Sequence, residues 1–152
     1  KQNQTRQFGG APPYGNLSVL AFALMTAANG GASNADSAAA LAINDVVDLG
    51  PLPEGLRLED ATLLIATAMT ASVTGSLGFK YEDGIDVPSA QQDAAYFGAG
   101  LALSTAARVR AAGTKLVTLP KSARLILTIT GAANAKVSDI KALVYGEQTG
   151  NR

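Results

Sequence analysis

The residues of this chain that could do chemistry are its carboxylates, because its 152 residues include neither histidine nor cysteine. Histidine is the usual general base near neutral pH and the commonest metal ligand. Its absence excludes Ser–His and Cys–His triads, and the absence of cysteine excludes thiolate catalysis and cysteine-ligated metal sites. We therefore predict that the chain is not an enzyme and uses no cofactor.

The densest acidic group is Glu82, Asp83 and Asp86, placed around Gly84. A calcium loop needs several oxygen ligands at fixed spacing, and this segment lacks the full pattern. Asp-Gly is a common pair in hairpin turns. We therefore interpret the segment as a solvated turn and predict no metal site.

Two further patterns invite a catalytic or nucleotide-binding interpretation. Glycoside hydrolysis needs two carboxylates about 5–10 Å apart across a cleft, and the candidates are Asp45, Asp48, Glu59 and Asp60. With four Phe, four Tyr and no Trp to stack on sugars, we favour solvated carboxylates. Gly98-Ala99-Gly100 is a fragment of a dinucleotide fingerprint that precedes a strand, so we interpret it as a backbone bend.

The charges are balanced and dispersed, with twelve Lys and Arg against twelve Asp and Glu. Such a chain gives no electrostatic reason for phosphate-backbone binding, so we predict no nucleic-acid partner. No run approaches the roughly 18 apolar residues of a membrane span, so we predict no membrane partner. Arg108 and Arg110 flank Val109, and we interpret them as an exposed strand edge where charge discourages pairing.

The elements that must position these residues are predicted to be strands. Leu17 to Ala27 is almost wholly apolar and ends at Asn29-Gly30-Gly31, which favours a strand covered on both faces, with helix still open. Residues 33–42 fit either a short capped Ala-rich helix or an extended segment. We favour the extended form, which leads into a strand that ends near Leu49, before the prolines.

Strand patterns then recur at regular spacing: Leu56–Thr70, Ser72–Tyr81, Tyr96–Leu103, Lys115–Leu119, Ala123–Thr130 and Val137–Tyr145. The alternation is clearest in Ala123–Thr130, where Leu125 and Leu127 share one face and Arg124 and Thr128 the other. About eight strands without βαβ alternation predict an all-β fold, an eight-stranded antiparallel jelly-roll sandwich. An immunoglobulin-like sandwich is the nearest alternative, but its Cys–Trp–Cys pattern is missing.

The predicted organisation is an extended N-terminal arm over residues 1–16, a jelly-roll domain over 17–147 and a C-terminal tail over 148–152. The first segment contains Gly9-Gly10 and Pro12-Pro13, which favour extended backbone. Both a disordered tail and an arm that orders on a neighbouring molecule remain open. In the second case the partner contacts would be Arg6, Phe8 and Tyr14, because Arg and aromatic side chains commonly anchor interfaces.

Several short strings resemble those of outer-shell proteins of tailed bacteriophages. They are Leu52-Pro53-Glu54-Gly55, Leu77-Gly78-Phe79 before Glu82-Asp83-Gly84, Ala112-Gly113-Thr114-Lys115, and Leu119-Pro120 followed by the run from Arg124 to Ala132. The resemblance covers roughly residues 40–146. It is to the jelly-roll decoration, or cement, proteins of tailed-phage capsids, such as those of the Bordetella phage group.

This resemblance implies a structural capsid decoration protein that binds the outside of an icosahedral phage head and stabilises the shell. The implied partners are a major capsid protein with an HK97-like fold and further copies of the chain, as a homodimer or homotrimer. The implied location is the exterior of the virion, after synthesis in the host cytoplasm. The alternative is a carbohydrate- or receptor-binding β-sandwich module of a phage particle, because jelly rolls also serve as lectins.

Overall fold

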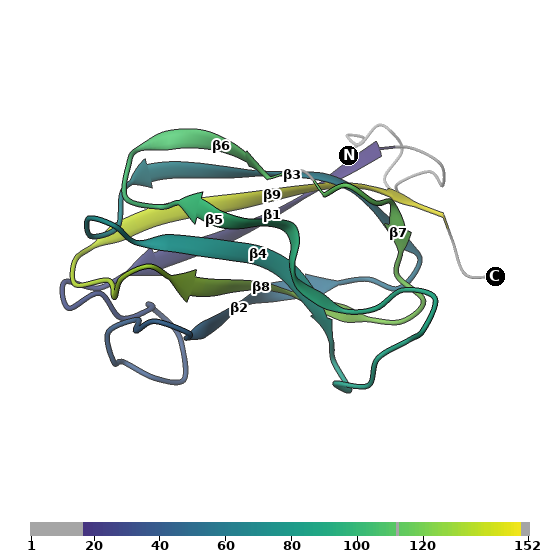
Figure 1. Cartoon of the computed structure of the whole chain (residues 1–152), viewed down its shortest axis with the longest axis horizontal. Helices are drawn as coiled ribbons and strands as arrows, with labels where there is room; N and C mark the ends of the chain where they lie inside the picture. The colour runs from purple at the N-terminus through teal and green to yellow at the C-terminus, as the bar shows by residue number, and fades with distance from the viewer. Residues whose placement is uncertain (1–16, 112, 150–152) are drawn as a thin grey trace, which may run out of the picture.

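The computed structural model describes residues 17–149 except Ala112, and no residue of this part is helical. Its strands, in chain order, are β1 (Leu17–Thr26), β2 (Val46–Leu52), β3 (Leu56–Thr67), β4 (Thr74–Tyr81), β5 (Asp93–Ala102), β6 (Ala107–Ala111), β7 (Val117–Thr118), β8 (Ala123–Thr130) and β9 (Ser138–Gln148). They form two antiparallel sheets packed face to face (Figure 1).

The strand order is that of a jelly roll. One sheet has the order β1-β9-β3-β6, and the two-residue β7 also pairs with β3. The other sheet has the order β2-β8-β4-β5. Without β7, successive strands wind between the sheets as two Greek keys, which defines the jelly roll. The predicted all-β jelly-roll sandwich is therefore confirmed, with β7 as a short addition to its eight main strands.

Alternation along the strands builds the core. In β8, Ala123, Leu125 and Leu127 point between the sheets and are fully buried, whereas Arg124 on the other face is half-buried, as predicted. Four aromatic side chains from β4 and β5 pack edge to face, with ring centroids 4.9 to 5.8 Å apart: Phe79, Tyr81, Tyr96 and Phe97. Such pairs add to the stabilisation that comes from burial alone.

The second strand was predicted wrongly at its end. β2 runs to Leu52 instead of ending near Leu49, and residues 33–42 form turns and bridges without a helix. The register with β8 shifts between Asp48 and Gly50, and Pro51 pairs with Arg124 beyond that shift. β2 lies at the edge of its sheet. Proline is tolerated there because an edge strand beside a bulge needs fewer ladder hydrogen bonds.

The first strand was predicted to be covered on both faces, and this is also wrong for the described residues. β1 pairs with β9 alone and lies at the edge of its sheet, at the rear of the view in Figure 1 (purple). Leu24 faces the core and is 4% exposed, whereas Leu17, Val19 and Met25 face outward and are 64%, 52% and 57% exposed. An apolar pattern on both faces cannot show which face another element covers.

A buried asparagine holds the turn that follows β1. Asn134 is fully buried, and its amide donates hydrogen bonds to the Thr26 hydroxyl at 3.2 Å, the Gly30 carbonyl at 3.2 Å and the Lys136 carbonyl at 2.9 Å. Its side-chain oxygen accepts a hydrogen bond from the Thr70 backbone N–H at 3.1 Å. One side chain therefore joins three loops at this end of the sandwich.

Candidate interaction surfaces

The predicted partner-contact residues Arg6, Phe8 and Tyr14 lie outside the described residues, with the rest of segment 1–16. Within the described part, three regions combine charged or exposed apolar side chains. They are the acidic turn after β4, a hollow beside β2, and the outer face of the sheet β1-β9-β3-β6.

The acidic turn does not gather its carboxylates around one point. Asp83 accepts a hydrogen bond from the Lys121 ammonium at 2.7 Å, and this bond is the main cause that lowers the pKa of Asp83. Asp86 accepts one from the Gln92 backbone N–H at 2.8 Å, and Glu82 lies 3.6 Å from the Arg124 guanidinium. In residues 17–149 without Ala112, no three ligating side chains stand together as a metal site.

The same turn is fixed against the sandwich. The Lys121 ammonium lies 4.7 Å from the centroid of the Tyr81 ring, a cation–π contact. The Tyr81 hydroxyl donates a hydrogen bond to the Ala90 carbonyl. Burial raises the pKa of Tyr81, with smaller contributions from Asp86 and Asp83. The segment is thus an ordered surface turn, which agrees with the sequence interpretation.

The four carboxylates considered for glycoside chemistry are divided between the two sheets. Asp45 precedes β2 and Asp48 lies in it, whereas Glu59 and Asp60 lie in β3 of the other sheet. Each is bound to a different group: Asp45 to the Ala42 N–H at 2.8 Å, Asp48 to Arg124 at 2.9 Å, Glu59 to Arg57 at 2.6 Å and Asp60 to Arg110 at 2.8 Å. The arrangement does not present a pair of free carboxylates across a cleft.

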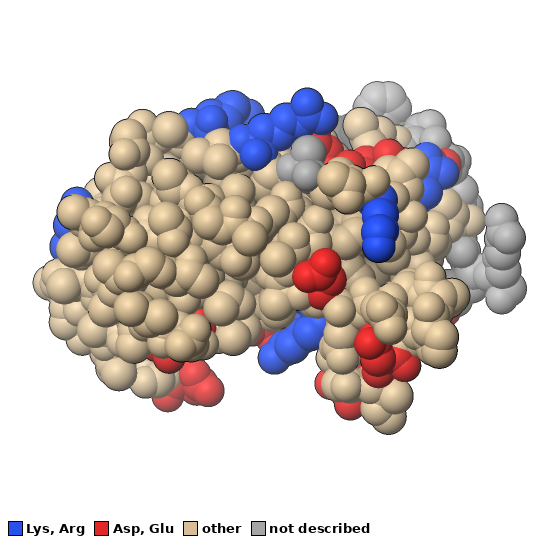
Figure 2. All heavy atoms as spheres, in the orientation of Figure 1, with Lys and Arg blue, Asp and Glu red and all other residues tan. Residues whose placement is uncertain are grey.

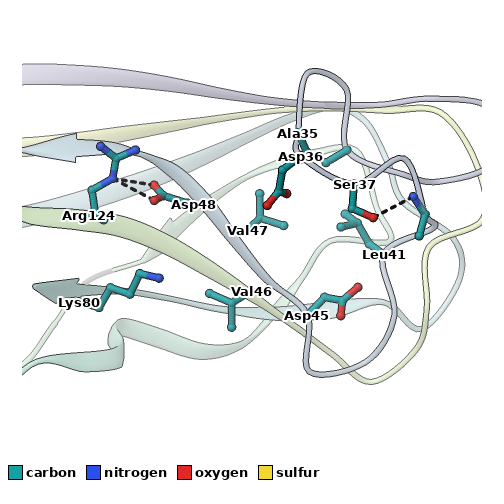
Figure 3. A pocket seen from close by; sticks show the side chains of 12 residues that line it. Ala35, Asp36, Ser37, Leu41, Asp45, Val46, Val47, Asp48, Lys80 and Arg124 are labelled. Carbon is teal, nitrogen blue, oxygen red and sulfur yellow. Dashed lines mark hydrogen bonds and ion pairs between the residues drawn. The ribbon is translucent and has the colours of Figure 1, made fainter. Parts of the chain in front are cut away.

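A hollow of about 680 Å³ lies beside β2 and the turns that precede it (Figure 3). Lys80 and the Arg124–Asp48 ion pair stand at one end of it, with Asp36 and Asp45 further along. Asp36, Asp45 and Lys80 are exposed, so the hollow is open to water. The hydrogen bond to Asp48 is the main cause that raises the pKa of the Arg124 guanidinium. Charges of both signs in an open hollow do not define one ligand.

The outer face of the sheet β1-β9-β3-β6 has an uncharged side at β1. The outward side chains of β1 are all apolar and all exposed: Leu17, Val19, Ala21, Ala23 and Met25. Next to them on β9, Leu143 is paired with Ala21 and Tyr145 with Val19. Exposed contiguous apolar surface commonly marks a site of protein contact.

The opposite edge of the same sheet is basic. Arg108 and Arg110 of β6 are exposed, and β6 pairs with β3 alone, which confirms the interpretation of this segment as a charged strand edge. Arg110 is bound to Asp60 at 2.8 Å. Basic side chains form a blue strip over β6 along the upper border of the space-filling view (Figure 2).

No aromatic side chain of the described part is fully exposed. Every Phe and Tyr of the described part is buried or half-buried: Phe22, Phe79, Tyr81, Tyr96, Phe97 and Tyr145. The described surface therefore lacks the cluster of exposed aromatic rings that is the expected signature of a sugar-binding module. The described part of the chain also contains no helix long and apolar enough to cross a membrane.

No protein-family model matches the chain, and no curated protein matches it. Among the solved structures that match the chain are two from phage capsids. A chain of the capsid of Ralstonia phage GP4 is 18% identical, with a TM-score of 0.67 over 93% of this chain and 90% of that chain. A chain of the cyanophage Pam1 capsid asymmetric unit is 17% identical, with a TM-score of 0.56 over 96% of this chain and 97% of that chain.

Proposed function

We propose that this chain is a structural decoration protein of a tailed-phage head, which binds the outside of the shell and stabilises it. The observation that carries the proposal is the likeness to two capsid chains over nearly the whole length of both partners. Those capsid chains are therefore jelly rolls of about this size, not larger proteins that contain one such domain. The decoration proteins that the sequence resembles are jelly rolls, and the resemblance implies attachment to a lattice of HK97-like subunits.

The surface chemistry agrees with a role in binding proteins. The carboxylates in the acidic turn and along β2 and β3 are bound to cations or backbone N–H groups, and the described residues gather no metal-ligating cluster. An exposed apolar row on β1 and a basic strip on β6 offer two kinds of contact. A protein that holds a shell together needs such surfaces on a rigid scaffold and needs no reactive group.

The segment of residues 1–16 is proposed to act as an arm on the shell. Arg6, Phe8 and Tyr14 would be its anchors, in contact with the major capsid protein, because Arg and aromatic side chains dominate many interfaces. Many copies on one head would let contacts that are weak individually add up to stable attachment.

Co-sedimentation tests both parts of this proposal. The full chain and a chain that lacks Lys1 to Gly15 are mixed with heads of the phage that carries the chain. We expect the full chain to saturate the heads and the truncated chain to bind about tenfold more weakly or worse. Equal thermal unfolding of the two chains is the control for the fold. If the full chain stays in the supernatant, the decoration role is wrong, and equal binding by both chains contradicts the role of the arm.

The alternative, a carbohydrate- or receptor-binding module, has less support from the described surface. Its expected signature is a cluster of exposed aromatic side chains, and those in the described part are buried or half-buried.

A further inference from the structure

Within the described residues, β1 differs from the other edge strands of the sandwich in having nothing that discourages pairing. β6 has five residues and carries Arg108 and Arg110, β2 contains a register shift and Pro51, and β5 pairs with register shifts and contains Gly98 and Gly100 at positive φ. β1 has ten residues, no charge and no proline, and pairs with β9 without a shift. A long, neutral, regular edge is a template for another strand.

The free hydrogen-bonding groups of β1 can be located from its turn. The Met25 carbonyl accepts a hydrogen bond from the Ser33 N–H at 2.7 Å, where the chain returns beside β1 through the bridge between Thr26 and Ala32. Backbone groups of alternate residues in a strand point to the same side. The groups that point away from β9 therefore belong to Leu17, Val19, Ala21 and Ala23. The returning turn covers the edge at Met25, so among the residues that the structure describes the free stretch runs from Leu17 to Ala23.

We propose that this stretch of β1 pairs antiparallel with the same stretch of a second copy, about a two-fold axis at Leu20. This register uses the whole free stretch. It places Leu17 opposite Ala23 of the second copy and Val19 opposite Ala21 of the second copy. The sheets β1-β9-β3-β6 of the two copies then form one continuous sheet. The pairing concerns the chain by itself and does not rest on the proposed attachment to a capsid.

The outward side chains are self-complementary in this register. The large residues Leu17 and Val19 occupy the first half of the stretch, and the small residues Ala21 and Ala23 occupy the second half. A two-fold axis at Leu20 places each large side chain opposite a small one. Antiparallel self-pairing reverses the order of large and small residues, so a second copy supplies the complementary row by itself, and this argues for a second copy as the partner.

The flanking strand β9 extends the match. Leu143 is paired with Ala21, and Tyr145 with Val19, so an apolar row of four side chains crosses the interface beside the axis: Leu143, Ala21, then Val19 and Tyr145 of the second copy. The next row has Lys141 at one end and Glu147 at the other, because these pair with Ala23 and Leu17. Lys141 contacts Asp139 at 3.3 Å, and Glu147 contacts Arg57, which also binds Glu59. Lys141 and Glu147 of the second copy therefore lie about three strand spacings, or roughly 14 Å, apart, and each is already paired within its own copy, so the row places no unpaired like charges against each other.

Sedimentation equilibrium of the purified full chain tests the surface. The variant is Val19→Lys, and the matched control is Val137→Lys, because these valines are 52% and 51% exposed and Val137 lies outside β1. We expect the wild-type chain and Val137→Lys to be dimers. Val19→Lys should raise the dimer dissociation constant at least tenfold, since it adds a charge at the pairing edge. Its far-UV circular dichroism should match the wild type, because the side chain is exposed.

Cysteine cross-linking tests the register. The chain has no cysteine, so each variant carries one thiol. Leu20 pairs with itself at a non-hydrogen-bonded position, where Cα atoms are about 4.5 Å apart, within the range of a disulfide. The control Ser18→Cys changes another half-buried residue on the same face, but the two copies of residue 18 would be about 14 Å apart. Mild oxidation should give a covalent dimer for Leu20→Cys and none for Ser18→Cys.

Several outcomes overturn the proposal. These are a wild-type chain that is monomeric or trimeric, equal dimerisation of Val19→Lys and Val137→Lys, and cross-linking of Ser18→Cys in place of Leu20→Cys. If the wild-type chain is monomeric and Val19→Lys fails to bind phage heads, the edge takes a strand of the shell protein instead. That result would leave the decoration role standing while removing the second copy.

Discussion

The two edges of the sheet β1-β9-β3-β6 present the same backbone groups but opposite side chains. β1 has ten residues with an uncharged outer row, and β6 has five residues with two exposed arginines. Both edges belong to one sheet, so they differ in strand length and side chains and not in the sheet that presents them. We expect charge and strand length, more than topology, to determine which edge of this sandwich takes a partner.

Ion pairs lie on the strands between the two edges of this sheet. Arg57 of β3 lies between Glu59 on its own strand and Glu147 on β9, and the hydrogen bond with Glu59 is the main cause that raises the pKa of the Arg57 guanidinium. Asp60 binds Arg110 at 2.8 Å toward the β6 edge. The β6 side thus carries two arginines, of which Arg110 is paired with Asp60, whereas the outward row of β1 contains no ionisable side chain.

The largest effect on stability is expected from substituting Asn134, which holds the turn at the end of β1. Asn134→Ala removes the hydrogen bonds to Thr26, Gly30, Lys136 and Thr70 and leaves several buried polar groups without partners. We expect the free energy of unfolding to fall by about 3 kcal/mol, measured by urea denaturation. The control Asn29→Ala affects an exposed asparagine of the same turn, with a loss of about 1 kcal/mol or less. Equal losses would show that the buried network does not hold the turn.

A medium effect is expected from making the β6 edge resemble the β1 edge. The double variant Arg108→Val, Arg110→Val removes both charges from β6, so we expect new concentration-dependent association in sedimentation velocity. It should be weaker than pairing through β1, because β6 is half as long. Lys141→Val is the control, since it removes an exposed charge from the central strand β9. Association of the control and the double variant to the same extent would mean that edge charge is not what protects β6.

The sequence predicted the parts of the fold that depend on strict alternation. β8 was predicted with its correct bounds, because Leu125 and Leu127 alternate with Arg124 and Thr128. β2 was placed wrongly because prolines normally end a strand, and only the pairing with β8 shows that Pro51 stands at an edge beside a bulge. The interpretation of the strand candidates as two packed sheets followed from their spacing alone.

The candidate surfaces were less predictable. The exposed face of β1 could not be found from the sequence, since a run apolar on both faces is typical of a fully covered strand. The role of Asn134 could not be predicted from the sequence, because the residue type alone does not distinguish an exposed loop asparagine from a buried one that joins three loops. Edge charge was the exception: Arg108 and Arg110 beside Val109 indicated an exposed edge, and the structure confirms it.

The smallest effect is expected in the turn after β4, in a region away from both edges. The pKa of Asp83 is lowered by the hydrogen bond from Lys121, so its contribution to stability is present above the unfolded pKa of about 3.9 and is lost as the pH falls below it. The melting temperature of the wild-type chain should exceed that of Asp83→Asn slightly at pH 7, and the two should converge at low pH. A difference that grows on acidification would contradict this assignment.

The central claim, a jelly roll that decorates the outside of a phage head, is tested most directly by electron cryomicroscopy of heads with and without the full chain. We expect additional density at regularly repeated positions on the outer surface, into which the two-sheet sandwich fits. We also expect this density to be absent from heads prepared without the chain. Heads incubated with saturating chain that show no added outer density, or that show it only inside the shell, would contradict the account.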